Sequence, residues 1–253
     1  MKYLEALQRK KVFDLSYATT LTANEKTAKS MLQAYKKAGY ITSVRRNLYT
    51  ALDLASKNPI PDRYEIACAV SASACISHHS ALEYHGIANQ VFYTVSVSSK
   101  ERFTAFTFDG VTYERYQPGI SGGVISPPMT PLVTVTDVER TIADCMYDID
   151  HAGGLEEVLE SLRLLPALDE NKLLSYLEEY NQIFLWQKAG FILMLFREML
   201  HISEDFFARC KSHIHERKRR LTDGSGLVYY PEWKLYAPKN PLTLLEDGGN
   251  ALV

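Results

Sequence analysis

The stretch from Phe13 to Ala51 constrains the fold more than any other part of the chain, because it combines helix signals with a hairpin signal. Thr22-Ala23-Asn24-Glu25 has the spacing of a capping box, in which the Thr and Glu side chains each accept a hydrogen bond from the other residue's backbone N–H. It predicts a helix that begins at Ala23, and Gly39 can supply the left-handed residue that ends it. Apolar residues recur every three or four positions and define one buried face: Ala28, Met31, Leu32, Tyr35 and Ala38.

The opposite face of this predicted helix is polar and cationic. It carries Lys26, Lys29, Ser30, Gln33 and Lys37. A shorter apolar helix is expected just before it, packed on the buried face, so that the pair forms a helix-turn-helix. The inward residues of this shorter helix are Phe13, Leu15, Ala18 and Leu21.

Two short β-prone runs follow, over residues 41–44 and 48–51, and Arg45-Arg46-Asn47 joins them as the basic tip of a predicted hairpin. Two helices followed by a basic hairpin are typical of a winged helix-turn-helix, whose second helix enters the major groove of double-stranded DNA. The predicted DNA-binding residues are Lys26, Lys29, Ser30, Gln33, Lys37, Arg45 and Arg46. The alternative is a small helical bundle whose lysine face meets only solvent.

Charge is unevenly distributed in a chain whose net charge is −2. Residues 1–55 contain 10 Lys or Arg and 4 Asp or Glu. Residues 56–253 contain 18 Lys or Arg and 26 Asp or Glu. Because phosphate contacts need local cationic charge, nucleic-acid affinity is expected mainly at the N-terminal end. A second basic cluster could contact DNA beside the first site or bind another nucleic acid, or could only complement a helix dipole. It consists of Arg209, Lys211, Arg217, Lys218, Arg219 and Arg220.

A linker is predicted over residues 53–61, because Asn58-Pro59-Ile60-Pro61 cannot continue a helix and suits a central strand poorly. We therefore expect a DNA-binding domain over residues 1–55 and an α+β domain over residues 56–253. Within the second domain, residues 103–116 form a predicted hairpin around Asp109-Gly110, and residues from about 155 to 220 are predicted to be helical.

Two short stretches of the predicted second domain resemble a known family. The first is Ser80-Ala81-Leu82-Glu83-Tyr84-His85-Gly86-Ile87, preceded by Ile76-Ser77. The second, residues 135–144, contains a predicted capping box from Thr136 to Glu139 and an Arg140–Asp144 pair at i, i+4. With Asn47-Leu48-Tyr49, these stretches resemble the AbiEi antitoxin group of bacterial regulators of abortive infection and phage defence. The resemblance covers about residues 10–145; the family commonly has Arg-Gly-Leu-Tyr where this chain has Arg46-Asn47-Leu48-Tyr49, and Asn tolerates the positive φ that the turn needs.

This resemblance implies an α+β fold in which an N-terminal winged helix-turn-helix precedes a mixed α/β antitoxin domain with a helical C-terminal part. It implies a transcriptional repressor that binds promoter DNA, with inverted repeats as the expected operator, and that represses its own toxin–antitoxin operon. It further implies neutralisation of a cognate nucleotidyltransferase toxin as the second task. No enzymatic activity is expected.

Two rival functions follow from the same sequence. One is a plain winged-helix regulator whose second domain senses a ligand. The other is a Mg²⁺-dependent nuclease. Many such enzymes have an acidic residue followed later in the chain by Glu-x-Lys, and Asp223 followed by Glu232-Trp233-Lys234 has the same pattern. The histidines and cysteines lack paired metal-ligand spacing, so we expect neither a metal nor a cofactor.

The first residues lack the apolar run of a signal peptide, and we expect a cytoplasmic protein without a membrane role. The most apolar stretch, residues 183–200, is interrupted by Gln187-Lys188 and Arg197-Glu198. It therefore predicts one buried helix. The four cysteines are expected to be buried thiols.

Overall fold

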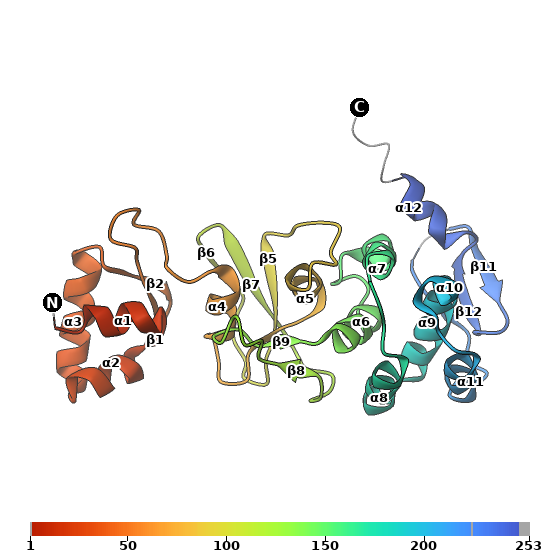
Figure 1. Ribbon diagram of the computed structural model, residues 1–253, viewed down its shortest axis with the longest axis horizontal. Helices are drawn as coiled ribbons and strands as arrows, with labels where there is room; N and C mark the ends of the chain where they lie inside the picture. The colour runs from red at the N-terminus through yellow and green to blue at the C-terminus, as the bar shows by residue number, and fades with distance from the viewer. Residues whose placement is uncertain (1, 224, 248–253) are drawn as a thin grey trace. The chain divides into compact units, whose positions relative to one another are not determined.

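The fold is α+β in the computed structural model, which describes residues 2–223 and 225–247 (Figure 1). Contacts divide the chain into two compact units, each built from separated segments. Unit 1 contains residues 1–76, 93–117 and 126–134, and unit 2 contains residues 77–92, 118–125 and 135–253. The predicted domain boundary at residues 55 and 56 lies inside unit 1.

The first part of unit 1 consists of three helices and a small antiparallel sheet (Figure 1). The elements in order are α1 (Leu4–Lys10), β1 (Val12–Asp14), α2 (Leu15–Thr22), α3 (Glu25–Lys37), β2 (Ile41–Arg45) and β3 (Leu48–Ala51). The strands lie in the order β1-β3-β2. Helices and sheet share one apolar cluster that includes Leu7, Phe13, Ala28, Leu32 and Ile41.

Two details of the predicted helix pair are wrong. Phe13 lies in β1, where it pairs with Tyr49 of β3, and not in a helix. The predicted capping box at Thr22 does not form, since Thr22 is the last residue of α2 and its hydroxyl donates to the Ala18 carbonyl at 3.2 Å. Asn24 caps α3 instead, its side chain accepting from the Thr27 N–H at 3.0 Å. The predicted left-handed residue after the helix is confirmed, with φ of 68° at Gly39.

The rest of unit 1 contains α4 (Arg63–Cys68) and the strands β4 (Cys75–Ile76), β5 (Thr94–Ser98), β6 (Phe106–Phe108) and β7 (Val111–Tyr116). These strands lie in the order β6-β7-β5-β4, with β5 and β7 parallel and the other neighbours antiparallel. The predicted hairpin is confirmed, with Asp109 and Gly110 both at positive φ in its turn.

Unit 2 is mainly helical. Its helices are α5 (His78–Tyr84), α6 (Val138–Tyr147), α7 (Gly154–Arg163), α8 (Glu170–Tyr180), α9 (Ile183–Met194), α10 (Arg197–Leu200) and α11 (Glu204–Ser212). The single helix predicted over residues 183–200 is instead two helices, interrupted at Leu195 and Phe196. The strands β8 (Val124–Ile125) and β9 (Val135–Thr136) pair antiparallel before α6.

A three-stranded sheet follows α11. It contains β10 (Arg219–Arg220), β11 (Leu227–Tyr230) and β12 (Leu235–Pro238), in the order β10-β12-β11. The 3₁₀ helix η1 (Pro241–Thr243) and α12 (Leu244–Asp247) complete the described part of unit 2. Within the described residues, no helix is long and apolar enough to cross a membrane.

Candidate functional site

The polar face of α3 is exposed, as its sequence predicts. Ala28 and Leu32 are buried under α2 and the sheet, which turns the other side of the helix to solvent. Every predicted DNA-binding residue of this helix is exposed: Lys26, Lys29, Ser30, Gln33 and Lys37. Their spacing places them along one side of about three helical turns.

Two of the lysines on α3 have partners within the protein. Lys29 pairs with Glu25 one turn earlier, with 2.5 Å between Nζ and Oε1, and this hydrogen bond and charge hold the pKa of the Glu25 carboxyl below its usual value. Lys36 donates to the Ser43 hydroxyl at 2.8 Å and so joins the end of α3 to β2. An exposed pair such as Lys29–Glu25 contributes little stability, so Lys29 can exchange Glu25 for a phosphate at small cost.

The two arginines at the hairpin tip, Arg45 and Arg46, have different surroundings. Arg45 folds back within unit 1, donates to the Val70 carbonyl at 2.7 Å and lies 5.3 Å from the centre of the Phe103 ring. Burial there lowers the pKa of its guanidinium. Arg46 is exposed, and Asn47 has φ of 60°, as the resemblance required. The hairpin therefore presents Arg46 to solvent and uses Arg45 internally.

Asn47 also connects the hairpin to α2. Its side-chain oxygen accepts from the Leu15 N–H at 3.2 Å, beside the cap that Asp14 provides to Tyr17. A groove of about 490 Å³ lies here, lined by α2, the start of α3 and Asn47. Ser16, Thr19 and Thr20 line it, and the hydroxyls of Thr19 and Thr20 donate to the carbonyls of Leu15 and Tyr17. Hydroxyl groups near a cationic helix can contact phosphates, and nothing in the sequence pattern singled them out.

The second basic cluster is largely engaged within unit 2. Arg209 donates to Glu178 at 2.7 Å and Lys211 pairs with Glu232. Lys218 lies 4.9 Å from the centre of the Tyr229 ring, and Arg219 lies 5.5 Å from that of Phe184. The structure therefore divides these cations between ion pairs and aromatic contacts. Arg217 and Arg220 are exposed to solvent.

The residues of the nuclease-like pattern are occupied by other contacts. Glu232 pairs with Lys211, Lys234 lies 3.4 Å from Glu216, and Trp233 is buried. Within residues 2–223 and 225–247, no three His, Cys, Asp or Glu side chains are arranged to hold a metal ion.

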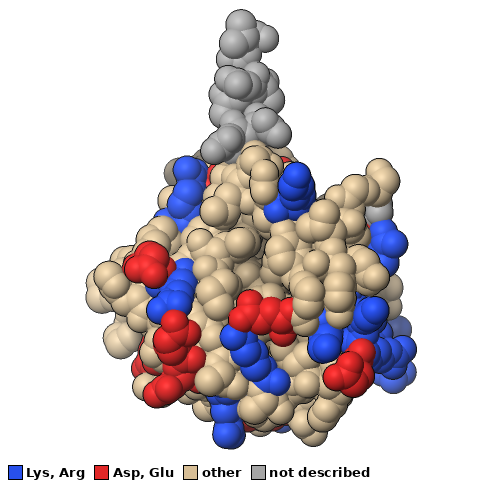
Figure 2. Space-filling view, turned by 90° about the vertical axis from the view of Figure 1, so that its right-hand side faces the viewer, with Lys and Arg blue, Asp and Glu red and all other residues tan. Residues whose placement is uncertain are grey.

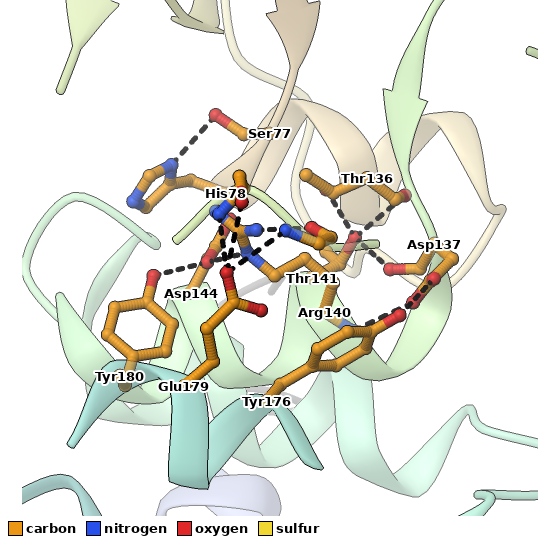
Figure 3. Close-up of polar contacts among 12 residues, drawn as sticks. Ser77, His78, Thr136, Asp137, Arg140, Thr141, Asp144, Tyr176, Glu179 and Tyr180 are labelled. Atoms are coloured by element: carbon orange, nitrogen blue, oxygen red, sulfur yellow. Dashed lines mark hydrogen bonds and ion pairs between the residues drawn. The ribbon is translucent and has the colours of Figure 1, made fainter. Parts of the chain in front are cut away.

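The second stretch that carries the family resemblance forms a buried polar centre in unit 2 (Figure 3). Arg140 and Asp144, predicted to pair, are both buried and lie 2.6 Å apart between Nε and Oδ1. Tyr180 of α8 donates to the same Asp144 oxygen, and Arg140 also donates to the Gly122 carbonyl. Burial, followed by the charge of Asp144, raises the pKa of Tyr180.

The start of α6 is held by the same centre. Asp137 caps the helix by accepting from the Arg140 N–H at 2.9 Å, and its other oxygen accepts from the Tyr176 hydroxyl at 2.7 Å. The predicted capping box from Thr136 to Glu139 is wrong, because Thr136 belongs to β9 and Glu139 accepts from Lys172 at 3.0 Å instead.

The loop over residues 118–123 packs against this centre so closely that its glycines have no room for a side chain. A Cβ at Gly123, whose φ is 74°, would lie 2.6 Å from Arg140 Cβ, and one at Gly119 would lie 2.2 Å from the Tyr180 ring. Glu179 accepts from the Ser121 N–H at 2.8 Å. Tyr176 and Tyr180 are buried and donate to Asp137 and Asp144, and Arg140 is buried and bonded to Asp144 and to Gly122 of the loop. These bonds join α6, α8 and the loop, so this centre stabilises unit 2.

Two acidic residues of α7, Glu157 and Glu160, are buried. Glu157 accepts from the Asn89 N–H at 2.8 Å and lies 3.2 Å from His79, and these hydrogen bonds outweigh burial and lower its pKa. Glu160 pairs with Arg163. Sequence periodicity could not identify the role of Glu157, because its partners Asn89 and His79 are 68 and 78 positions away in the chain.

No protein-family model matches this chain, and no curated protein matches it. A solved structure that is similar is the crystal structure of the RV2827C protein from Mycobacterium tuberculosis, with a TM-score of 0.65 and 16% sequence identity. The match covers 98% of this chain and 94% of that chain. The two proteins therefore share an α+β fold, and at this identity the likeness concerns the fold alone.

Proposed function

We propose that residues 1–55 are a winged helix-turn-helix that binds double-stranded promoter DNA, with α3 in the major groove. The observation that carries this proposal is the exposed cationic face of α3 opposite Ala28 and Leu32, followed directly by the β2–β3 hairpin. Lys26 and Lys37 are suited to phosphates, and Gln33 can form the paired hydrogen bonds that an adenine edge offers. Arg46 at the hairpin tip adds a backbone or minor-groove contact.

The second half of the proposal is that this protein is the antitoxin of a toxin–antitoxin operon and represses that operon. It rests on the resemblance of residues 80–87 and 135–144 to the AbiEi group. The buried polar centre supports it by giving Asp137, Arg140 and Asp144 of the second stretch a defined structural task. The cognate toxin is a nucleotidyltransferase in this proposal, and the protein itself performs no catalysis.

A gel-shift assay on the protein's own promoter tests the DNA-binding half. The triple variant Lys29→Ala, Gln33→Ala, Lys37→Ala should lose about a hundredfold or more in affinity, since each base or phosphate contact contributes on the order of 1 to 3 kcal/mol. The matched control, Lys100→Ala with Arg102→Ala, removes the same charge from exposed positions elsewhere in unit 1. Equal affinity of the triple variant and the control would refute the role of α3.

Salt dependence gives a second readout from the same titration. Neutralising roughly four to six phosphates predicts that log affinity falls with log salt at a slope of about −4 to −5. In the triple variant the slope should be about two units shallower, because two lysines are gone.

A further inference from the structure

The sheet formed by β10, β12 and β11 has two faces of different chemistry, which follow from its register. Arg220 lies beside Tyr236, and Tyr236 lies beside Tyr229, so these three residues form one row across the strands. The neighbouring row contains Arg219, Leu235 and Tyr230, and it faces the core: Leu235 is fully buried and Tyr230 packs on Phe191.

We name the side that carries Tyr229 and Tyr236 the outer face. Because side chains alternate along a strand, Lys218 lies on the same side as Arg220, and its Nζ is 4.9 Å from the centre of the Tyr229 ring. The two tyrosine rings are partly exposed and lie 5.0 Å apart at 40°. The outer face therefore combines two adjacent aromatic rings with two exposed cations, and its strands carry no carboxylate.

We propose that this outer face binds single-stranded nucleic acid. Bases without a pairing partner can stack on Tyr229 and Tyr236, and Lys218 and Arg220 can neutralise the phosphates between them. Aromatic rings on neighbouring strands with flanking cations are the arrangement by which proteins bind single strands without strong sequence preference. Duplex DNA suits the face poorly, because its bases are already stacked and leave only phosphates to contact.

Charge in the surrounding segment favours the same partner. Residues 209–239 contain 8 Lys or Arg and 3 Asp or Glu. Two of these three acidic residues form ion pairs with lysines that do not belong to the Arg220-Tyr236-Tyr229 row. Glu216 pairs with Lys234, and Glu232 pairs with Lys211. Figure 2, turned so that the right-hand side of Figure 1 faces the viewer, shows Lys and Arg at many points, gathered most densely at the lower right with an acidic group among them.

The core holds the sheet rigidly beneath this face. Gln187 of α9 is buried and donates to the carbonyls of Arg217 and Trp233, both at 3.1 Å, which fixes the residues just before β10 and β12. Gly190 lets Trp233 lie directly on α9, since a Cβ there would be 2.0 Å from the Trp ring. The tyrosines are thus presented on a fixed scaffold, which lowers the entropic cost of ordering a single strand on it.

Fluorescence anisotropy with the full chain tests the proposal, using labelled 12-nucleotide oligo-U, oligo-dT and a 12-base-pair duplex. The chain should carry the triple substitution in α3, which removes the duplex site proposed for unit 1. We expect both single strands to bind at least tenfold more tightly than the duplex. Tyr229→Ala with Tyr236→Ala should weaken single-strand binding tenfold or more, whereas Tyr229→Phe with Tyr236→Phe should stay within twofold, because stacking needs the ring and not the hydroxyl.

A second pair of substitutions leaves the rings in place. Lys218→Ala with Arg220→Ala should weaken binding and reduce the salt slope by about 1.4, which is the expected contribution of two phosphate contacts on a single strand. These exposed changes do not touch the core, so they remain informative if the alanine variants of the tyrosines fail to fold. Duplex binding as tight as single-strand binding, or alanine and phenylalanine variants of equal affinity, would overturn the proposal. Preference for oligo-U over oligo-dT would identify RNA as the natural partner, and the reverse would identify DNA single strands.

Discussion

Gly123 lies where the loop over residues 118–123 meets α6 and α8, and two separate constraints act on it. Its φ of 74° is one that L-residues adopt only at a cost, and an added Cβ would lie 2.6 Å from Arg140 Cβ and 2.9 Å from the Tyr176 ring. From the sequence, Gly122-Gly123 could be recognised only as a pair without the spacing of a nucleotide-binding loop. Its actual task, close approach to two helices, depends on residues that are 17 and 53 positions away.

Gly123→Ala should therefore destabilise unit 2 by about 2 to 4 kcal/mol, of which about 1 kcal/mol is the cost of left-handed Ala and the rest is overpacking. Gly86→Ala is the matched control, since Gly86 also has positive φ, at 72°, with no atom within 4 Å of the added Cβ. Denaturant unfolding followed by circular dichroism measures both. Equal losses in the two variants would show that the close packing of the loop contributes nothing.

Lys188 is a buried cation whose effect depends on pH. Its Nζ donates to the Tyr147 carbonyl at 2.8 Å, and burial lowers its pKa to about 8. Between pH 8 and 10.5 the unfolded lysine holds a proton that the folded one has lost, so this group makes the free energy of unfolding rise with pH. Buried cysteines and tyrosines have raised pKa values and act in the opposite direction, which calls for a difference measurement.

The difference in unfolding free energy between the wild type and Lys188→Met isolates this lysine. It should grow in favour of the wild type by about 2 kcal/mol between pH 7.5 and pH 9.5. Urea unfolding at four or five pH values in that range measures it. A difference that stays constant with pH would mean that Lys188 keeps its ordinary pKa in the folded protein.

At the scale of elements, the sequence predicted the types well and the ends less well. Helix, helix and hairpin appear in the expected order because apolar periodicity and the Gly39 and Asp109-Gly110 signals act locally. The predicted caps at Thr22 and Thr136 are wrong because another capping residue follows each of them closely, Asn24 two positions later and Asp137 one position later. Which of two neighbouring residues becomes the cap depends on where the preceding element ends, and this is set by packing.

In the β2–β3 hairpin, we expect alanine substitutions of the two arginines to have different effects. Arg45→Ala should destabilise unit 1 by about 2 kcal/mol, because it removes a charged hydrogen bond to Val70 and contacts with two Phe rings. Arg46→Ala should change stability by less than about 0.5 kcal/mol. It should instead weaken promoter binding and reduce the salt slope by about 1.

Thermal unfolding and promoter titration of both single variants check this pair. The two arginines are adjacent and carry the same charge, so each serves as the other's control. A loss of stability in Arg46→Ala, or none in Arg45→Ala, would contradict the assignment of Arg45 to the interior and Arg46 to DNA.

At the scale of the whole molecule, the α+β class followed from the sequence, but the division into units did not. Unit 1 is assembled from three separated segments, and the predicted linker packs within it, as Ile60 does against the N-terminal apolar cluster. Lys11 also pairs with Glu65 of α4 at 2.6 Å. Contacts of this kind join residues that are far apart in sequence, so composition and breaker residues could not reveal them. Point substitutions on the surface of α3 therefore test the proposed functions separately without removing residues that pack within unit 1.

The most direct test of the proposed function uses the α3 triple variant in cells that carry the toxin gene and a reporter for the operon promoter. Growth under induced toxin and reporter activity are measured on the same strain. We predict that the variant loses repression, so that reporter activity rises to the level without antitoxin, while growth is rescued as well as by the wild type. Rescue lost together with repression in a folded variant, or repression retained, would contradict the account of a DNA-binding antitoxin with separable tasks.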